Sequence, residues 1–216
     1  RDTEKQIDTQ PFGSKFVGDV VLTPNAVSDL LGWLQGQLSD TQLIAGSSLF
    51  KDSVGQAIAS PLFTLKSRFD APGVAAISGD AFTASPVTVV DNGRLLALTP
   101  TLYGSRKTGI RHVPTTSGWD IAAGAVPLAD VIGGVQRGAI VGRLSMGMPA
   151  ANGNFSGVIK NSFAVQDGKQ GHALAETMIA GNMAQMLQDI VAVSRDVIDA
   201  GATRLPWIRV GNLHFS

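Results

Sequence analysis

Residues 155–179 decide the fold, and they read FSGVIKNSFAVQDGKQGHALAETMI. Two arms of this stretch, 155–165 and 170–179, are rich in the apolar and β-branched residues that favour strands. Between the arms lies Asp167-Gly168-Lys169, a turn sequence in which glycine readily adopts a positive φ angle. The stretch therefore predicts a β-hairpin.

The rest of the chain predicts more strands than helices. A second hairpin is expected at 87–98, where Asn92-Gly93 separates two apolar runs, and Thr23-Pro24 begins a helix that ends near Ser39. Further helices are expected at 101–109, at 127–137 with Gly138 as its cap, and at 182–189; further strands are expected at 20–22, 62–65, 139–144, 190–193 and 207–210. A repeated strand–helix–strand rhythm is missing, which argues against a doubly wound parallel sheet. We expect an α+β protein with a largely antiparallel or mixed β-sheet and a few helices.

The composition argues against several classes of protein. The 216 residues include 17 basic and 17 acidic side chains, and no cysteine. Zero net charge argues against a general nucleic-acid binder, because phosphate contacts need clustered lysine and arginine. The missing cysteines exclude disulfides, thiolate zinc sites and iron–sulfur clusters. No apolar run approaches the about 18 residues of a membrane span, so neither nucleic acid nor membrane is an expected partner.

The first residues differ in character from the rest. Residues 1–18 are polar and contain Pro11 and Gly13, so we predict a linker or the remnant of a missing N-terminal domain, followed by one domain at 19–216. The chain starts without an initiator methionine and without the apolar core of a signal peptide. We interpret it as a fragment or a processed form whose missing part lies upstream.

Few residues carry recognisable chemistry. The three histidines, His112, His172 and His214, are too far apart in sequence to chelate a metal from one helix face. Strand alternation places His172, Leu174 and Glu176 on one face of the sheet. Two interpretations of His172 and Glu176 stay open: a catalytic carboxylate–histidine pair, and a structural salt bridge or backbone contact at the rim of the sheet. Nucleophile elbows, phosphate loops and dinucleotide fingerprints are missing, and a triad assembled from distant residues stays untestable at this level.

Three segments, in order, resemble the TldD/PmbA family, which also carries the name modulator of DNA gyrase. The most specific is the third: GNFSG at 153–157, FAVQDG at 163–168, ETMIAGN at 176–182 and LQDIVAV at 187–193. The other two are VVLTP at 20–24 with the following helix and GSSLF at 46–50, then VVDNGRL at 89–95 with SRKTG at 105–109. The likeness covers about residues 17–215 and implies the C-terminal part of a subunit.

The resemblance also implies which kind of subunit this is. TldD-type members carry a His-Glu-x-x-x-His zinc motif on the helix equivalent to 25–38, and a cysteine ligand near the C-terminus. The matching positions here hold Gly32, Trp33 and Gln37. Glycine, tryptophan and glutamine offer zinc no usual ligand and no base for its water. The chain therefore resembles the PmbA/TldE type, with no catalytic residue and no metal or other cofactor of its own.

The family likeness implies a role beside a zinc-bearing partner. PmbA/TldE-type members pair with a TldD-type subunit into a cytoplasmic metallopeptidase complex that processes peptides or unfolded proteins, and we expect such a heterodimer here, or a homodimer. The residues expected to line a peptide- or partner-binding surface are Gly153, Asn154, Phe155, Ser156, Gly157, His172, Glu176, Thr177 and Asn182. Alternatives are a self-sufficient hydrolase with a non-zinc site and a homo-oligomeric peptide-binding module without catalysis. Residues 69–86 depart from the family pattern, in a neutral, alanine-rich stretch.

Overall fold

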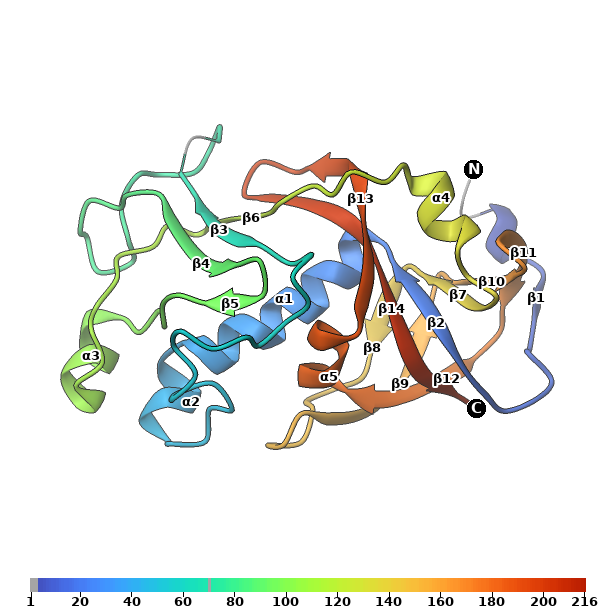
Figure 1. Ribbon diagram of the computed structural model, residues 1–216, viewed down its shortest axis with the longest axis horizontal. Coiled ribbons are helices and arrows are strands. Elements are labelled where there is room, and N and C mark those ends of the chain that lie inside the picture. Colours follow the sequence, from blue (N-terminus) through green and yellow to red (C-terminus); the bar gives the residue numbers. More distant parts are fainter. Residues whose placement is uncertain (1–3, 70) are drawn as a thin grey trace. The chain divides into compact units, whose positions relative to one another are not determined.

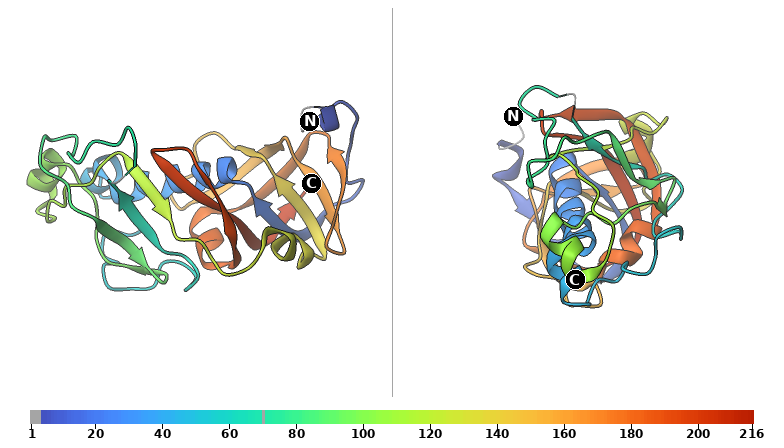
Figure 2. Two further views of the ribbon diagram at one scale, coloured as in Figure 1. Left: turned by 90° about the horizontal axis from the view of Figure 1, so that it is seen from above. Right: turned by 90° about the vertical axis from the view of Figure 1, so that its left-hand side faces the viewer.

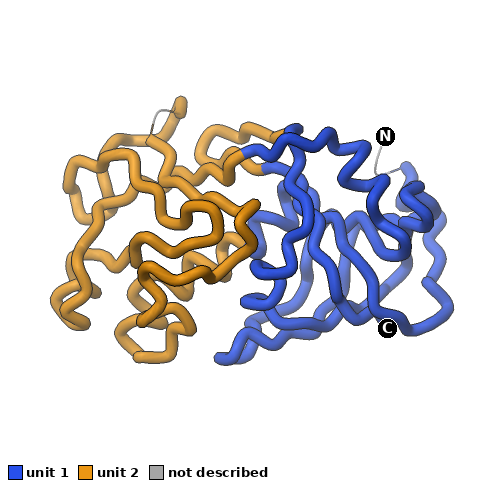
Figure 3. Tube along the Cα trace, viewed as in Figure 1, with its two compact units in different colours: residues 1–30, 123–196, 206–216 blue, residues 31–122, 197–205 orange. Residues whose placement is uncertain are grey.

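The computed structural model describes residues 4–69 and 71–216. These residues form two compact units, and neither is continuous in sequence (Figure 3). Unit 1 contains the described residues up to Leu30, together with Ala123–Asp196 and Pro206–Ser216. Unit 2 contains Leu31–Ala122 and Val197–Leu205. The chain therefore passes between the units four times.

Unit 1 is built on a mixed β-sheet (Figure 1). Its strands run in the order β1-β11-β10-β7-β2-β14, where β14 is Thr203–Phe215. Strand β14 also pairs with β12, which pairs with β9, and β9 pairs with β8. The pairs β2–β7 and β1–β11 are parallel, whereas β2–β14, β7–β10, β9–β12 and β8–β9 are antiparallel. The bounds are β1 Thr9–Gln10, β2 Phe16–Leu22, β7 Arg137–Val141, β8 Arg143–Ser145, β9 Asn154–Lys160, β10 Phe163–Gln166, β11 Lys169–Leu174 and β12 Thr177–Asn182, preceded by a 3₁₀ turn at Glu4–Gln6.

The stretch 155–179 turns where the sequence predicts, but its arms are not single strands. Asp167 and Gly168 adopt positive φ angles of 48° and 74° and join β10 to β11 in an antiparallel hairpin. Each predicted arm is interrupted, the first at Asn161, which has a φ of 53°, and the second between Leu174 and Thr177. The outer halves of the two arms become β9 and β12, which pair with each other. The result is two ladders in place of the one hairpin predicted.

Helix α4, Leu128–Gly133, covers one face of this sheet. Val131 and Val135 pack in a buried cluster with one valine or isoleucine from each of the strands β2, β7 and β10. The prediction of a helix at 127–137 capped by Gly138 was wrong at its end, since Gly134 is the C-cap and β7 begins at Arg137. Gly138 lies inside the ladder, where an added Cβ would come within 1.9 Å of the Asp19 carbonyl oxygen. Close strand packing explains this glycine.

Unit 2 combines short strands with helices. Strand β3, Leu65–Arg68, pairs antiparallel with β4 and β6, and β6 pairs in parallel with the first residues of β14. The predicted hairpin at 87–98 is confirmed with a shorter second strand, and the short helix between Thr101 and Gly109 is confirmed with both as its caps. The other bounds are α2 Asp40–Ile44, β4 Val87–Asp91, β5 Arg94–Leu95, α3 Leu102–Thr108 and β6 Gly118–Ile121.

Three elements belong to both units. Helix α1, Pro24–Leu38, begins in unit 1 and ends in unit 2, close to the bounds predicted from its apolar spacing. The strands β13, Ile190–Asp199, and β14, Thr203–Phe215, are both much longer than predicted (red in Figure 2). Between β12 and β13 lies α5, Met183–Gln188, close to the predicted bounds, and its Met183, Met186 and Leu187 are buried.

The expected fold class is confirmed, because the described residues form an α+β arrangement with a mixed sheet. None of the helices in the described part of the chain is long and apolar enough to cross a membrane.

Candidate functional site

Helix α1 presents three positions that the family resemblance aligns with a zinc motif. Gly32 is exposed and has open space beside it. Trp33 is half-buried and meets Phe50 edge to face, with ring centroids 6.0 Å apart. Gln37 is 4% exposed, and its Oε1 accepts a hydrogen bond from the Leu49 N–H at 2.9 Å. Trp33 and Gln37 therefore make packing and hydrogen-bond contacts within unit 2, whereas Gly32 has no neighbour where a side chain would stand.

The donor set around α1 does not fit a zinc ion. Zinc sites in proteins use histidine nitrogen, cysteine sulfur or carboxylate oxygen. Neither Gly32 nor Trp33 supplies such an atom, and the amide oxygen of Gln37 is already engaged by a backbone N–H. The sequence contains no cysteine, and across residues 4–69 and 71–216 no three His, Asp or Glu side chains gather into a possible metal site.

Strands β9 and β12 bring most of the predicted surface residues together. In their antiparallel ladder Asn182 lies opposite Asn154, and Ala180 lies opposite Ser156. Phe155 is buried and Ser156 exposed, as alternation along a strand requires. An added Cβ on Gly157 would come within 2.6 Å of the Met146 Cα, so this glycine lets the β8–β9 loop pack closely.

Asn182 connects three elements at the end of this ladder. Its Oδ1 accepts from the N–H groups of Ala184 and Gln185 at 3.0 and 3.1 Å, which caps α5. Its Nδ2 donates to the Asn152 carbonyl and to the Asn154 Oδ1, both at 2.8 Å. The sequence marks Asn182 only as a surface residue, whereas its contacts make it an organiser of the loop and the helix.

The predicted face shared by His172, Leu174 and Glu176 does not form. Strand β11 ends at Leu174, and Glu176 lies outside both β11 and β12. His172 is exposed, but Ala173 and Leu174 are both buried, so simple alternation fails here. A register shift between β10 and β11 and the bend before β12 account for the break. Within the part of the chain described, no ion pair joins His172 to Glu176.

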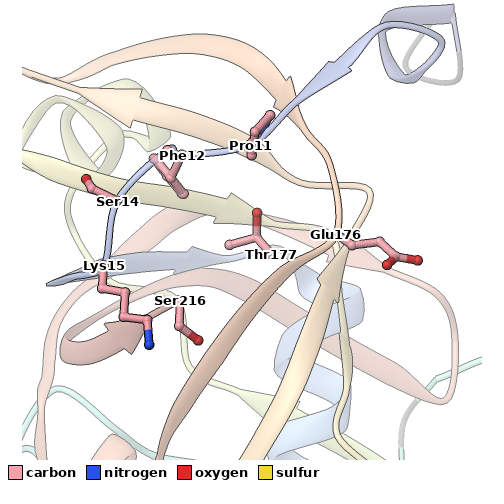
Figure 4. Close-up of a pocket in the computed structure, with 8 residues that line it drawn as sticks. Pro11, Phe12, Ser14, Lys15, Glu176, Thr177 and Ser216 are labelled. Carbon is pink, nitrogen blue, oxygen red and sulfur yellow. The ribbon is translucent and has the colours of Figure 1, made fainter.

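A pocket of about 270 Å³ lies beside Glu176 and Thr177 (Figure 4). The N-terminal segment forms one wall, and the last residue another; the lining residues are Pro11, Phe12, Gly13, Ser14, Lys15, Glu176, Thr177 and Ser216. The Thr177 hydroxyl donates to the Ala175 carbonyl at 3.0 Å, and the Glu176 carboxylate points away from the pocket in Figure 4. Lys15 and Glu176 are the two ionisable side chains among the residues that line this pocket.

Sequence reasoning missed the N-terminal contribution to this pocket. Residues 4–18 include β1, which pairs with β11, and Phe12, whose ring meets Phe215 edge to face at 5.4 Å. Ser14 accepts a hydrogen bond from the Arg137 guanidinium at 2.7 Å. The aromatic residues Phe12 and Phe16 were the available signal, because a flexible linker rarely carries large apolar side chains. Whether residues 1–18 also act as a linker stays a prediction.

One carboxylate of unit 1 ties helix α1 to strand β8. Asp29 accepts the Leu144 N–H at 3.0 Å, so the outer side of β8 is engaged by a side chain of the helix. Burial raises the pKa of Asp29, and this outweighs the Leu144 hydrogen bond and the Arg143 charge, which both lower it.

The sequence matches one known class of protein over almost its whole length. Residues 16–216 match the model of the PmbA/TldA metallopeptidase C-terminal domain. The Metalloprotease PmbA of Escherichia coli is 24% identical over 211 residues, which cover 88% of this chain and 45% of that protein. The chain therefore belongs to the PmbA/TldD family, as the family resemblance of the sequence predicts.

Solved structures share the fold. A protein from Bacteroides thetaiotaomicron that is named as a modulator of DNA gyrase superposes with a TM-score of 0.89 at 22% identity, over 99% of this chain and 49% of that one. TldE from Thermococcus kodakarensis gives 0.84 at 20% identity, over 100% and 53%. The chain thus spans about half the length of these relatives.

Proposed function

We propose that this chain is the zinc-free, C-terminal part of a PmbA/TldE-type subunit that works beside a zinc-bearing TldD-type partner. One observation carries the proposal. The helix positions equivalent to the zinc motif hold an exposed glycine, a tryptophan packed on Phe50, and a buried glutamine whose oxygen is engaged by a backbone N–H. A helix with these side chains offers no ligand and no base, so the chemistry falls to the partner.

The partner supplies the cofactor in this proposal. Zinc, bound there, would polarise the peptide carbonyl and activate water, and the present chain would shape the space in which the peptide lies. The name of the Escherichia coli relative, a metalloprotease, supports a peptide as the substrate class. The complex is proposed to be a cytoplasmic heterodimer, with a homodimer as the second form.

Extended peptides commonly bind by adding a strand to a sheet edge. Strand β9 lies between β8 and β12, and β12 lies between β9 and β14, so both are interior strands of the sheet, although β8 pairs only with Val158–Lys160 of β9. Strand β11 pairs with β1 only at Ala173 and Leu174. We place the peptide contact at the open part of β11, from Lys169 to His172, and at the adjoining pocket of Glu176 and Thr177.

The test compares the purified 216-residue chain alone, a TldD-type subunit alone, and the two together. Zinc content is measured by mass spectrometry, and cleavage of an unstructured fluorogenic peptide is followed in each sample. We expect less than about 0.1 zinc per chain for this protein alone, since its α1 offers no ligand set, and cleavage only when the partner is present.

A chelator-treated partner serves as the control and should abolish cleavage in the mixture. Stoichiometric zinc in the isolated chain, or cleavage by it, would overturn the proposal. Light scattering of the mixture separates a heterodimer from a homo-oligomeric module, because the latter would show no species of mixed mass.

A further inference from the structure

A second pocket, of about 390 Å³, lies in unit 2 and is rich in charge. Its lining residues come from β3, β6, the loop before β4 and the ends of β13 and β14; they are Lys66, Ser67, Arg68, Phe69, Pro86, Asp120, Asp199 and Arg204. Five of the eight are ionisable. No motif in the sequence points to them, because they are spread over 139 positions of the chain, from 66 to 204.

Strand register places three of these charges in one row. Lys66 on β3 lies opposite Asp120 on β6, and Asp120 lies opposite Arg204 on β14. The Arg204 guanidinium contacts the Asp120 carboxylate at 3.1 Å. Lys66 is exposed and makes no ion pair with any described residue. Asp120 thus has a cation on each side, but only Arg204 is bonded to it.

The other two charges bind each other. Arg68 holds Asp199 with two parallel hydrogen bonds of 2.7 and 2.8 Å. This bidentate contact, with the Gly201 N–H, lowers the pKa of Asp199 to about 2, so the carboxylate stays ionised at neutral pH. The lining residues therefore carry three cations and two anions, and the lysine amine is the charge that is left over.

We propose that this pocket, defined by Lys66, Asp120 and Arg204, binds the carboxylate of an acidic side chain in an extended peptide. The Lys66 amine and the remaining donors of Arg204 recognise an oxyanion, and the apolar surfaces of Phe69 and Pro86 suit the peptide beside it. This inference rests on the proposed role in peptide processing, and it names a substrate preference that the role leaves open.

Binding is measured on the full chain without a partner, so its failure leaves the zinc-free role untouched. The probe is a fluorescein-labelled decapeptide of alternating glutamate and alanine, compared with one of alternating glutamine and alanine, by fluorescence anisotropy at low salt. We expect the acidic peptide to bind more tightly, and added salt to weaken it. Lys66→Gln should weaken its binding about two- to fivefold, the range of an exposed charge pair.

Asp120→Asn gives the reciprocal test. Asp120 competes with the ligand for Lys66 and Arg204, so its neutralisation should tighten binding of the acidic peptide by about two- to fivefold. Lys51→Gln, at an exposed lysine elsewhere in unit 2, is the matched control and should change nothing. Inorganic phosphate at matched ionic strength tests whether any oxyanion suffices.

Three results would overturn the proposal. The first is equal binding of the two peptides. The second is an unchanged affinity in Lys66→Gln or a loss of affinity in Asp120→Asn, which a merely structural role of this pair would produce. The third is displacement of the acidic peptide by phosphate at the concentration where the peptide itself half-saturates the chain.

Discussion

At the scale of single residues, glycines of this chain serve opposite purposes. Gly32 lies within helix α1 with nothing near the place where a Cβ would stand. Gly157 lies in β9, where the same atom would come within 2.6 Å of both Cα and Cβ of Met146. The family resemblance draws attention to both positions, but only the structure shows that one is open and the other is packed.

Alanine substitution should therefore act with opposite sign at these two glycines. Gly157→Ala should lower the free energy of unfolding by about 1–3 kcal/mol, because the β8–β9 loop must shift to admit the methyl group. Gly32→Ala should raise it by about 1 kcal/mol, because alanine is the better helix former. Urea unfolding followed by circular dichroism measures both. A neutral result at Gly157 would mean that the loop moves freely.

At the scale of elements, helix ends and strand ends are fixed by different kinds of contact. Helix α3 begins at the side-chain cap of Thr101 and ends at Gly109, which has a left-handed φ angle, and α5 begins at the side-chain cap of Asn182. Strand ends depend instead on distant partners. Strand β1 pairs with the last two residues of β11, and just beyond them the Ala175 N–H donates to the Gln10 carbonyl at 3.0 Å. Local chemistry therefore predicts helix ends better than strand ends.

Asn182 offers a test of one such end. Asn182→Ala removes the α5 cap and both Nδ2 hydrogen bonds, and we expect a loss of about 1–2 kcal/mol in the free energy of unfolding. Asn182→Asp retains the acceptor for Ala184 and Gln185 but removes the donor to the Asn152 carbonyl and to the Asn154 Oδ1, so its loss should be smaller than that of Asn182→Ala. Equal losses in the two variants would show that the cap contributes nothing. Thermal and urea unfolding supply the measurement.

At the scale of the whole molecule, each unit is assembled from separated pieces of chain. Unit 2 needs residues 197–205, because the Trp119 N–H donates to the Ala202 carbonyl at 2.7 Å and β6 pairs with the start of β14. Unit 1 needs both ends of the chain, because β2 pairs with β14 over much of its length. Although the net charge is zero, each unit contains a carboxylate with a shifted pKa, and the two shifts have opposite directions.

Asp29 and Asp199 should therefore show opposite linkage to pH. Asp29 in unit 1 has a pKa raised above its ordinary value of 3.8, so the native state binds the proton more tightly than the unfolded state does. The free energy of unfolding therefore falls as pH rises from 3.8 through the raised pKa. Asp199 in unit 2 has a pKa lowered to about 2, so its contribution is present above 3.8 and is lost as pH falls through about 2.

The two asparagine variants measure this difference. Relative to the wild type, Asp29→Asn should become more stable between pH 3 and pH 6, because the amide still accepts from Leu144 without a buried charge. Asp199→Asn should become less stable over the same interval, because the amide loses the charged contact with Arg68. Urea unfolding at pH 3 and pH 6 measures the free energy of unfolding of each variant relative to the wild type. Changes of the same sign in the two variants would contradict the opposite pKa shifts assigned to Asp29 and Asp199.

The candidate site was only partly predictable. The turn at Asp167-Gly168 and the helix expected at 182–189 follow from side chains within a few residues, and the structure confirms both. The hairpin predicted over 155–179 implies the pairing of β9 with β12, but the interruptions at Asn161 and near Glu176, which split the hairpin into two ladders, were not predicted. The predicted His172–Glu176 face failed for the same reason.

The amino-acid sequence by itself determined the fold class, the family, and the lack of zinc ligands at Gly32, Trp33 and Gln37, since these depend on residue types and short-range spacing. Only the tertiary structure decided which strands are neighbours, that Pro11 to Lys15 line a pocket with Thr177, and that Lys66, Asp120 and Arg204 share a row. The physical reason is that strands pair through backbone hydrogen bonds, which can join residues at any separation along the chain. The periodicity of the side chains indicates a strand but does not identify the strand with which it pairs.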